Sequence, residues 1–86
     1  MQLHEVIEEH GIIVAARPEV GLIVAWDYTE STGVLSVMKD NNMNGDYELT
    51  EQYDLEGDNT PANAEEEAED VLDDVLGEEG EENENE

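Results

Sequence analysis

The chain has 86 residues and a formal net charge of −24, produced by 26 acidic and only 2 basic side chains. A chain of this length forms one small domain, which excludes a large enzyme core. The charge excludes nucleic acid and anionic lipid as partners, because an acidic surface repels both. Since cysteine is absent, a disulfide framework and a thiolate metal site are excluded as well.

The N-terminal part of the chain predicts a helix followed by three strands. Leu3, Val6 and Ile7 recur at helical spacing before Gly11, which suits a helix C-cap, and they predict a short helix. Runs rich in β-branched and other apolar residues then predict three strands, at 12–15, 22–28 and 34–38. A turn beginning at Pro18 separates the first two strands, so we expect them to pair as a hairpin.

A fourth strand is predicted where apolar and polar residues alternate, between residues 46 and 55. One face of this strand would carry Tyr47, Leu49, Glu51, Tyr53 and Leu55. The other face would carry Asp46, Glu48, Thr50, Gln52 and Asp54. The strand is therefore expected to be half apolar and half acidic.

An acidic amphipathic helix is predicted over residues 61–76. Thr60 followed by Pro61 is typical of a helix start, with the hydroxyl as N-cap and proline in the first turn. The apolar residues that follow share one helical face: Ala64, Ala68, Val71, Leu72, Val75 and Leu76. Gly77 favours the end of the helix, and residues 77–86, which carry no large apolar side chain, are expected to be disordered.

These elements predict a small α+β fold with a three- or four-stranded antiparallel sheet. Residues 1–76 would form one domain, strand-rich over 11–56 and helical over 61–76, with 77–86 as an acidic tail. Crowded carboxylates destabilise the C-terminal helix, so its apolar face must dock against the sheet or against a second copy. We expect a homodimer that buries Trp26 or the strand edges.

One local motif points to calcium. Asp40, Asn42, Asn44, Gly45 and Glu51 match the spacing of a calcium loop, in which oxygen side chains alternate before a bidentate glutamate. The twelve residues resemble an EF-hand loop, although Tyr47 stands where that family usually has an aliphatic residue and a strand precedes the loop. We favour a plain hairpin turn built on Asn44 and Gly45, and keep calcium binding by Asp40, Asn42, Asn44 and Glu51 as the alternative.

Catalytic chemistry is not indicated by the sequence. Carboxylates are abundant, but none is distinguished by a neighbouring apolar pocket or a partner base. His4 and His10 do not share a helical face, and with one tryptophan and three tyrosines the chain offers little for a substrate pocket. We therefore expect neither an enzyme nor a cofactor.

The charge pattern itself predicts a function. B-DNA carries about one negative charge per 1.7 Å of axis, so 24 charges correspond to about 12 base pairs. Many of the carboxylates fall on segments predicted to be ordered: Asp46, Glu48, Asp54, Glu65, Glu66, Glu69, Asp70, Asp73 and Asp74. Carboxylates held in place can imitate a phosphate lattice, whereas those of a disordered tail imitate it poorly. These nine residues are the predicted partner-binding site.

In size, acidity and lack of cysteine, and in its pairing of a small β scaffold with an acidic helix, the chain resembles the DNA-mimic proteins of phages and mobile elements. That resemblance implies a non-catalytic inhibitor that occupies the DNA-binding groove of a basic host protein. The candidate targets are DNA gyrase or another topoisomerase, a restriction or CRISPR nuclease, and a nucleoid protein. The alternatives are a calcium-binding interaction module and an acidic, chaperone-like binder of basic proteins.

The predicted location is the cytoplasm, and it is the host cytoplasm if a phage encodes the protein. Residues 1–10 lack a basic stretch followed by a long apolar run, so they do not resemble a secretory signal. The apolar runs are also far shorter than the roughly 20 residues that span a bilayer.

Overall fold

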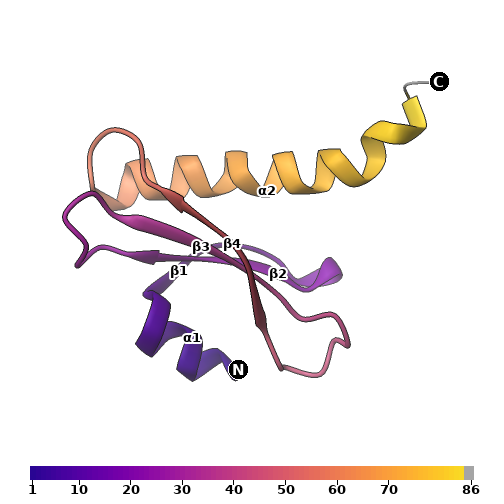
Figure 1. The fold of residues 1–86 in the computed structure, drawn as a ribbon, viewed down its shortest axis with the longest axis horizontal. Coiled ribbons are helices and arrows are strands. Elements are labelled where there is room, and N and C mark those ends of the chain that lie inside the picture. Colours follow the sequence, from indigo (N-terminus) through magenta and orange to yellow (C-terminus); the bar gives the residue numbers. More distant parts are fainter. Residues whose placement is uncertain (85–86) are drawn as a thin grey trace.

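A computed structural model describes the backbone of residues 1–84 and the side chains as far as Gly77. The elements follow the chain in the order α1 (Leu3–His10), β1 (Ile12–Arg17), a 3-10 turn (Pro18–Val20), β2 (Leu22–Asp27), β3 (Val34–Lys39), β4 (Glu48–Asp54) and α2 (Pro61–Glu84). Figure 1 shows a twisted sheet between two helices, with the long helix α2 on one face and α1 on the other. The predicted α+β fold, with its four-stranded antiparallel sheet, is confirmed.

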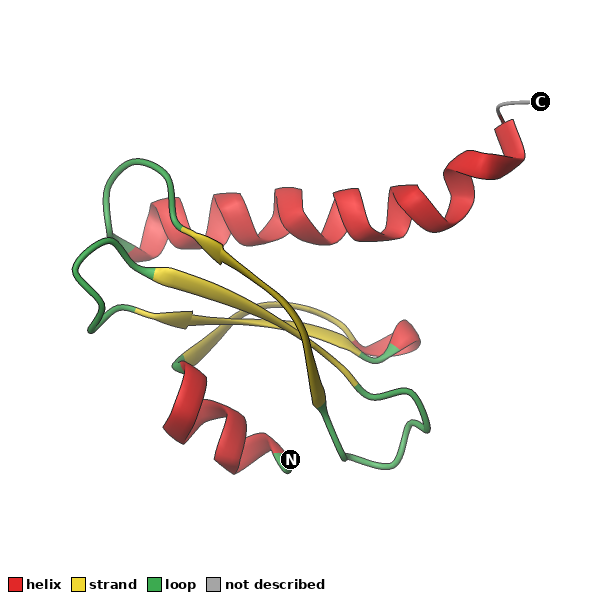
Figure 2. Cartoon of the chain, viewed as in Figure 1, coloured by secondary structure: helices red, strands yellow, loops and turns green. Residues whose placement is uncertain are grey.

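The four strands form a meander in the order β1-β2-β3-β4, with every neighbouring pair antiparallel. The 3-10 turn joins β1 to β2 and confirms the predicted hairpin. Gly21 closes this turn with a φ of 73°, a left-handed conformation that glycine adopts without steric cost. Short connections between antiparallel neighbours explain why consecutive strands lie side by side, as Figure 2 shows.

The sheet has an apolar core on each face. On the α2 side, Val24, Trp26 and Leu35 pack with the helix residues Ala68 and Leu72. On the α1 side, a smaller cluster joins Val6 of α1 to alternate residues of β2 and β3: Ile23, Ala25 and Met38. Because β2 is covered on both faces, five of its six residues are buried.

The predicted faces of β4 are wrong. A bulge interrupts the pairing, because Val37 lies opposite Glu51 while Met38 lies opposite Leu49, which leaves Thr50 as the extra residue. The Thr50 hydroxyl donates to the Val37 carbonyl, 3.1 Å away. An extra residue reverses the alternation of a strand, so Leu49 lies on the α1 side of the sheet while Glu51 and Tyr53 lie on the α2 side.

Helix α2 begins as predicted but ends later. It starts at Pro61, and the Asn63 amide donates to the Thr60 hydroxyl over 3.4 Å, which confirms Thr60 as the N-cap. The predicted end at Gly77 is wrong, because the backbone stays helical to Glu84. Gly77 lacks the positive φ of a helix-ending glycine, and the glutamates beyond it are good helix formers.

The segment 77–86, predicted to be disordered, is therefore helical backbone as far as Glu84, and residues 85 and 86 lie outside the described residues. Within residues 1–84, no helix is long and apolar enough to cross a membrane.

Candidate functional site

The predicted site requires that helix α2 be held in place. The structure meets this requirement, because the apolar face of α2 docks on the sheet. Ala64, Ala68 and Leu72 are fully buried against the core of β1 and β2. Val71, Val75 and Leu76 are partly buried around them. The small alanine side chains allow the helix to lie close to the strands. The carboxylates on the rest of the helix surface are therefore carried on a fixed backbone.

Six of the nine predicted site residues lie together on the solvent-facing side of α2, and all six are exposed. They form two rows at i, i+4 spacing: Glu65, Glu69 and Asp73, and Glu66, Asp70 and Asp74. With Glu67 included, seven carboxylates occupy ten residues, or about 15 Å of helix at 1.5 Å per residue. That is about one charge per 2 Å, close to the value of about 1.7 Å for B-DNA.

Arg17, at the end of β1, contacts two of these carboxylates. The sequence did not predict this contact. Its Nη2 lies 2.5 Å from Glu69 Oε1 and 3.7 Å from Asp73 Oδ1. The hydrogen bond to Glu69 raises the pKa of the Arg17 guanidinium above its ordinary value. Glu69 and Asp73 are thus partly neutralised and help to hold the helix against β1, whereas Glu65, Glu66, Asp70 and Asp74 make no such contact within the described residues.

Two asparagines fix the loop that leads into α2. Asn59 Oδ1 accepts a hydrogen bond from Trp26 Nε1 at 2.8 Å, and Asn59 Nδ2 donates to the carbonyls of Tyr28 and Glu30. Asn63 Nδ2 donates to the main-chain carbonyls of residues 56 and 58. Apart from the preference of asparagine for loops, no sequence pattern predicts these contacts. Trp26 is buried within one copy of the chain, so it is not available for the predicted dimer interface.

The three remaining predicted residues lie away from the α2 rows. Asp46 precedes β4, where its carboxylate accepts a hydrogen bond from the amino group of Met1 at 2.6 Å. Glu48 lies opposite Lys39 in the register of β3 and β4. Asp54 lies opposite Val34, which places it on the α1 side of the sheet. The structure therefore concentrates the predicted site on one helix instead of spreading it over helix and strand.

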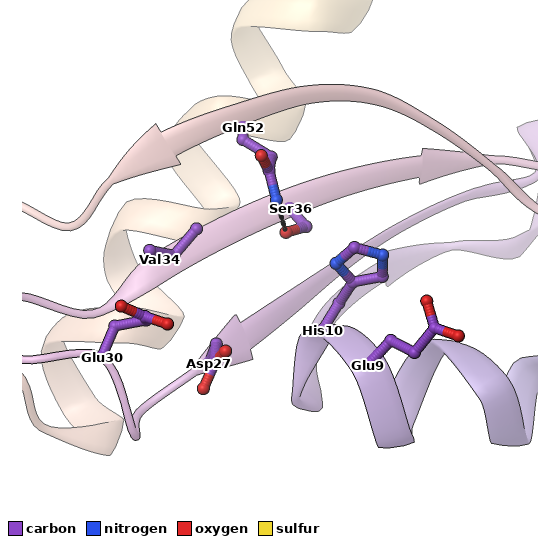
Figure 3. Close-up of a pocket in the computed structure, with 7 residues that line it drawn as sticks. All are labelled: Glu9, His10, Asp27, Glu30, Val34, Ser36 and Gln52. Carbon is purple, nitrogen blue, oxygen red and sulfur yellow. Dashed lines mark hydrogen bonds between the residues drawn. The ribbon is translucent and has the colours of Figure 1, made fainter.

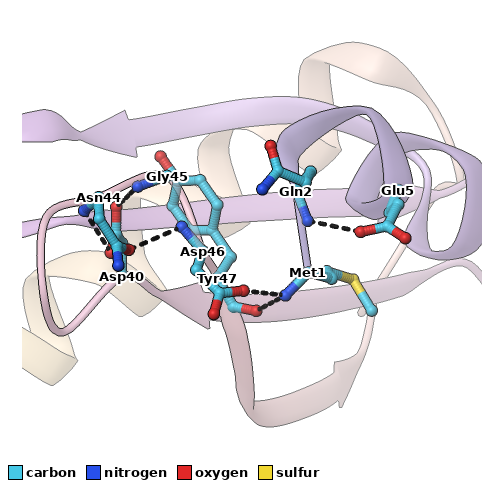
Figure 4. Close-up of polar contacts among 8 residues, drawn as sticks. All are labelled: Met1, Gln2, Glu5, Asp40, Asn44, Gly45, Asp46 and Tyr47. Atoms are coloured by element: carbon cyan, nitrogen blue, oxygen red, sulfur yellow. Dashed lines mark hydrogen bonds and ion pairs between the residues drawn. The ribbon is translucent and has the colours of Figure 1, made fainter.

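In the loop between β3 and β4, side chains that were candidate calcium ligands instead accept hydrogen bonds from main-chain amides of the same loop (Figure 4). Asp40 is buried, and its two carboxylate oxygens accept hydrogen bonds from the amides of Asn44 and Gly45, at 3.1 and 2.7 Å. Asn42 is exposed in the same loop, and Asn44 Oδ1 accepts from the Asp46 amide.

Glu51 is not brought to this loop, because it lies in β4 opposite Val37, about three residues or 10 Å along the strand from the Asp40 end. Within the described residues, no group of three or more His, Asp or Glu side chains is arranged to hold a metal ion. Calcium binding by Asp40, Asn42, Asn44 and Glu51 stays a prediction that the loop geometry does not support.

The hairpin turn predicted at Asn44 and Gly45 also differs from the structure. The left-handed residues are Met43 and Gly45, with φ of 55° and 89°. A two-residue turn of the Asn-Gly kind (type I′) would need positive φ at both Asn44 and Gly45, and Asn44 is not left-handed. The connection is instead a longer loop that Asp40 closes through its carboxylate.

No family model, curated protein or solved structure matches this chain. Its function is therefore inferred from the geometry and charge of its own residues.

Proposed function

We propose that the protein is a DNA mimic that occupies the DNA-binding groove of a basic host protein and inhibits it without catalysis. The observation that carries this proposal is the double row of exposed carboxylates on a docked helix, spaced at about one charge per 2 Å when Glu67 is included. Lysine and arginine side chains that neutralise phosphates can pair with these carboxylates by the same charge-assisted hydrogen bonds.

The position of the acids favours mimicry over a solubilising tail. A tail would concentrate its charge beyond the folded part of the chain, whereas here seven carboxylates lie between Glu65 and Asp74, on turns whose opposite side is buried in the core. Like charges at i, i+4 destabilise a helix, so this arrangement lowers the stability of α2. A binding function accounts for retaining it.

The size of the molecule is also compatible with a short duplex. Its longest dimension is 42 Å, which corresponds to about 12 base pairs at 3.4 Å each. The candidate targets are gyrase or another topoisomerase, a restriction or CRISPR nuclease, and a nucleoid protein. Because they share basic DNA-binding grooves, charge geometry does not distinguish them.

The test begins with capture of partners from a bacterial lysate on the immobilised protein, followed by elution with duplex DNA. Each eluted protein is then purified, and its binding to a fluorescent duplex is measured by anisotropy with increasing amounts of the inhibitor. A DNA mimic raises the apparent Kd for DNA without lowering the anisotropy reached at saturating target protein. It also loses affinity as salt increases, and it works in EDTA.

Two variants of equal net charge make this test specific to α2. The helix variant replaces Glu65, Glu66, Asp70 and Asp74 by their amides. The control replaces four exposed acids elsewhere by theirs: Glu8, Glu19, Glu56 and Asp58. If each of the four helix contacts contributes about 0.5 kcal/mol, the helix variant binds the target roughly thirtyfold more weakly, and the control changes little.

Equal weakening of the two variants would contradict mimicry by α2. It would favour the chaperone-like alternative, in which total charge matters and its placement does not.

A further inference from the structure

Strand β4 has an open edge. It is the last strand of the sheet, all seven of its residues are exposed, and neither helix packs closely on it, since both helices lie over β1 and β2. Figure 2 shows β4 at the border of the sheet. An edge of this kind presents unpaired main-chain groups to which another extended chain can bind.

The pairing with β3 identifies the groups that face outward. The Leu55 amide donates to the Gly33 carbonyl at 3.0 Å, so Leu55 faces β3, and alternation along the strand gives the same direction to Tyr53. The amide and carbonyl groups of Gln52 and Asp54 therefore face away from β3. No hydrogen bond within the described residues reaches these outward groups.

Just before β4, the same edge already pairs with one other residue, Met1. The amino group of Met1 donates to the Tyr47 carbonyl at 2.6 Å, and the Tyr47 amide donates to the Met1 carbonyl at 2.7 Å (Figure 4). This exchange of two hydrogen bonds is the unit of antiparallel pairing. The stretch from Leu49 to Asp54 stays open, and at about 3.3 Å per residue it is as long as an ordinary strand.

A cavity of about 330 Å³ opens beside this stretch, on the α1 side of the sheet. Gln52 of β4 and Ser36 of β3 line its floor, joined by a hydrogen bond, and His10 ends α1 at one side (Figure 3). Three carboxylates surround it: Glu9, Asp27 and Glu30. The volume is at the lower end of ligand cavities, which suits a single long side chain better than a separate small molecule.

We propose that the β4 edge binds an extended segment of a partner protein by strand addition, and that a lysine or arginine of this segment enters the cavity. A residue paired with Gln52 would place its side chain on the same face, about 5 Å away, beside the three carboxylates. Glu48, Glu51 and Asp54 of β4 itself also favour a basic segment.

Because β4 is acidic, a second copy of the chain is a poor partner for its edge. Two β4 strands paired with each other would bring acidic side chains opposite one another, with no basic residue in either strand. The proposed edge does not use the α2 carboxylates, so it stands independently of DNA mimicry.

The test uses an acetylated and amidated heptapeptide of alternating threonine and lysine, titrated into the ¹⁵N-labelled full-length protein at low salt. Strand addition slows hydrogen exchange of the Gln52 and Asp54 amides by at least about tenfold, while the Tyr53 and Leu55 amides, already bonded to β3, change little. A version of the peptide N-methylated at alternate backbone nitrogens keeps its charge and binds at least about tenfold more weakly.

Matched variants separate the edge from the cavity. Asp54→Pro removes the outward amide and is tolerated at an edge, whereas Asp54→Asn removes only the charge, so the proline variant loses more affinity than the asparagine variant. The double variant Glu9→Gln with Glu30→Gln weakens binding more than Glu8→Gln with Glu19→Gln, although the two doubles have the same net charge.

Two results would overturn the proposal. One is a spread of chemical-shift changes over α2 without slower exchange at Gln52 and Asp54, which would indicate charge attraction alone. The other is slow exchange at these two amides without peptide that increases with protein concentration, which would identify a second copy as the occupant.

Discussion

Replacing Asp70 by asparagine is predicted to stabilise the protein and weaken its binding to the target. Asp70 is exposed and has four acidic neighbours at i±3 and i±4: Glu66, Glu67, Asp73 and Asp74. Each repulsive pair costs about 0.2–0.5 kcal/mol, so removing one charge stabilises the fold by roughly 1–2 kcal/mol at low salt. Asparagine and aspartate have similar helix propensities, so propensity contributes little to the difference.

The assay is urea and thermal unfolding followed by circular dichroism, at about 10 mM and about 1 M salt. A gain of about 1 kcal/mol raises the Tm by about 4–8 °C in a domain of this size. The gain disappears at high salt, because the screening length falls from about 30 Å to about 3 Å. Asp58→Asn, in the loop before α2, is the control and shows a smaller gain. An Asp70 variant no more stable than the wild type at low salt would refute this account of the helix.

Three further predictions concern the scaffold. Gly77→Ala extends the stable part of α2 and adds about 1 kcal/mol to the free energy of unfolding, because Gly77 is helical and a Cβ added there would meet no atom within 4 Å. Thermal unfolding measures this gain. Asn59→Ala leaves Trp26 Nε1 without its acceptor and costs about 2–3 kcal/mol, which urea unfolding measures through the fluorescence of the single tryptophan; an unchanged urea midpoint would contradict it. The hydrogen bond to Asp46 raises the pKa of the Met1 amino group above 8.0, so its contribution to stability is full below about pH 8 and is lost as pH rises through the folded pKa. The urea midpoint therefore falls less between pH 7 and pH 10 in Asp46→Asn than in the wild type.

The local chemistry of the chain was sufficient to predict the elements and the start of α2. The β-branched runs favour strands through the shape of their own side chains, and Thr60 with Pro61 favours a helix start through contacts only a few residues long. The acidic face of α2 was predictable for the same reason, because helical periodicity assigns one side to apolar residues and the other to the carboxylates.

Only the tertiary structure decided where the charge lies relative to the sheet. The bulge at Thr50 reverses the faces of β4, and Arg17 reaches Glu69 across 52 residues of sequence. The placement of both helices over β1 and β2 leaves the edge of β4 open. These features depend on which distant segments pack together, and periodicity within one segment carries no information about that.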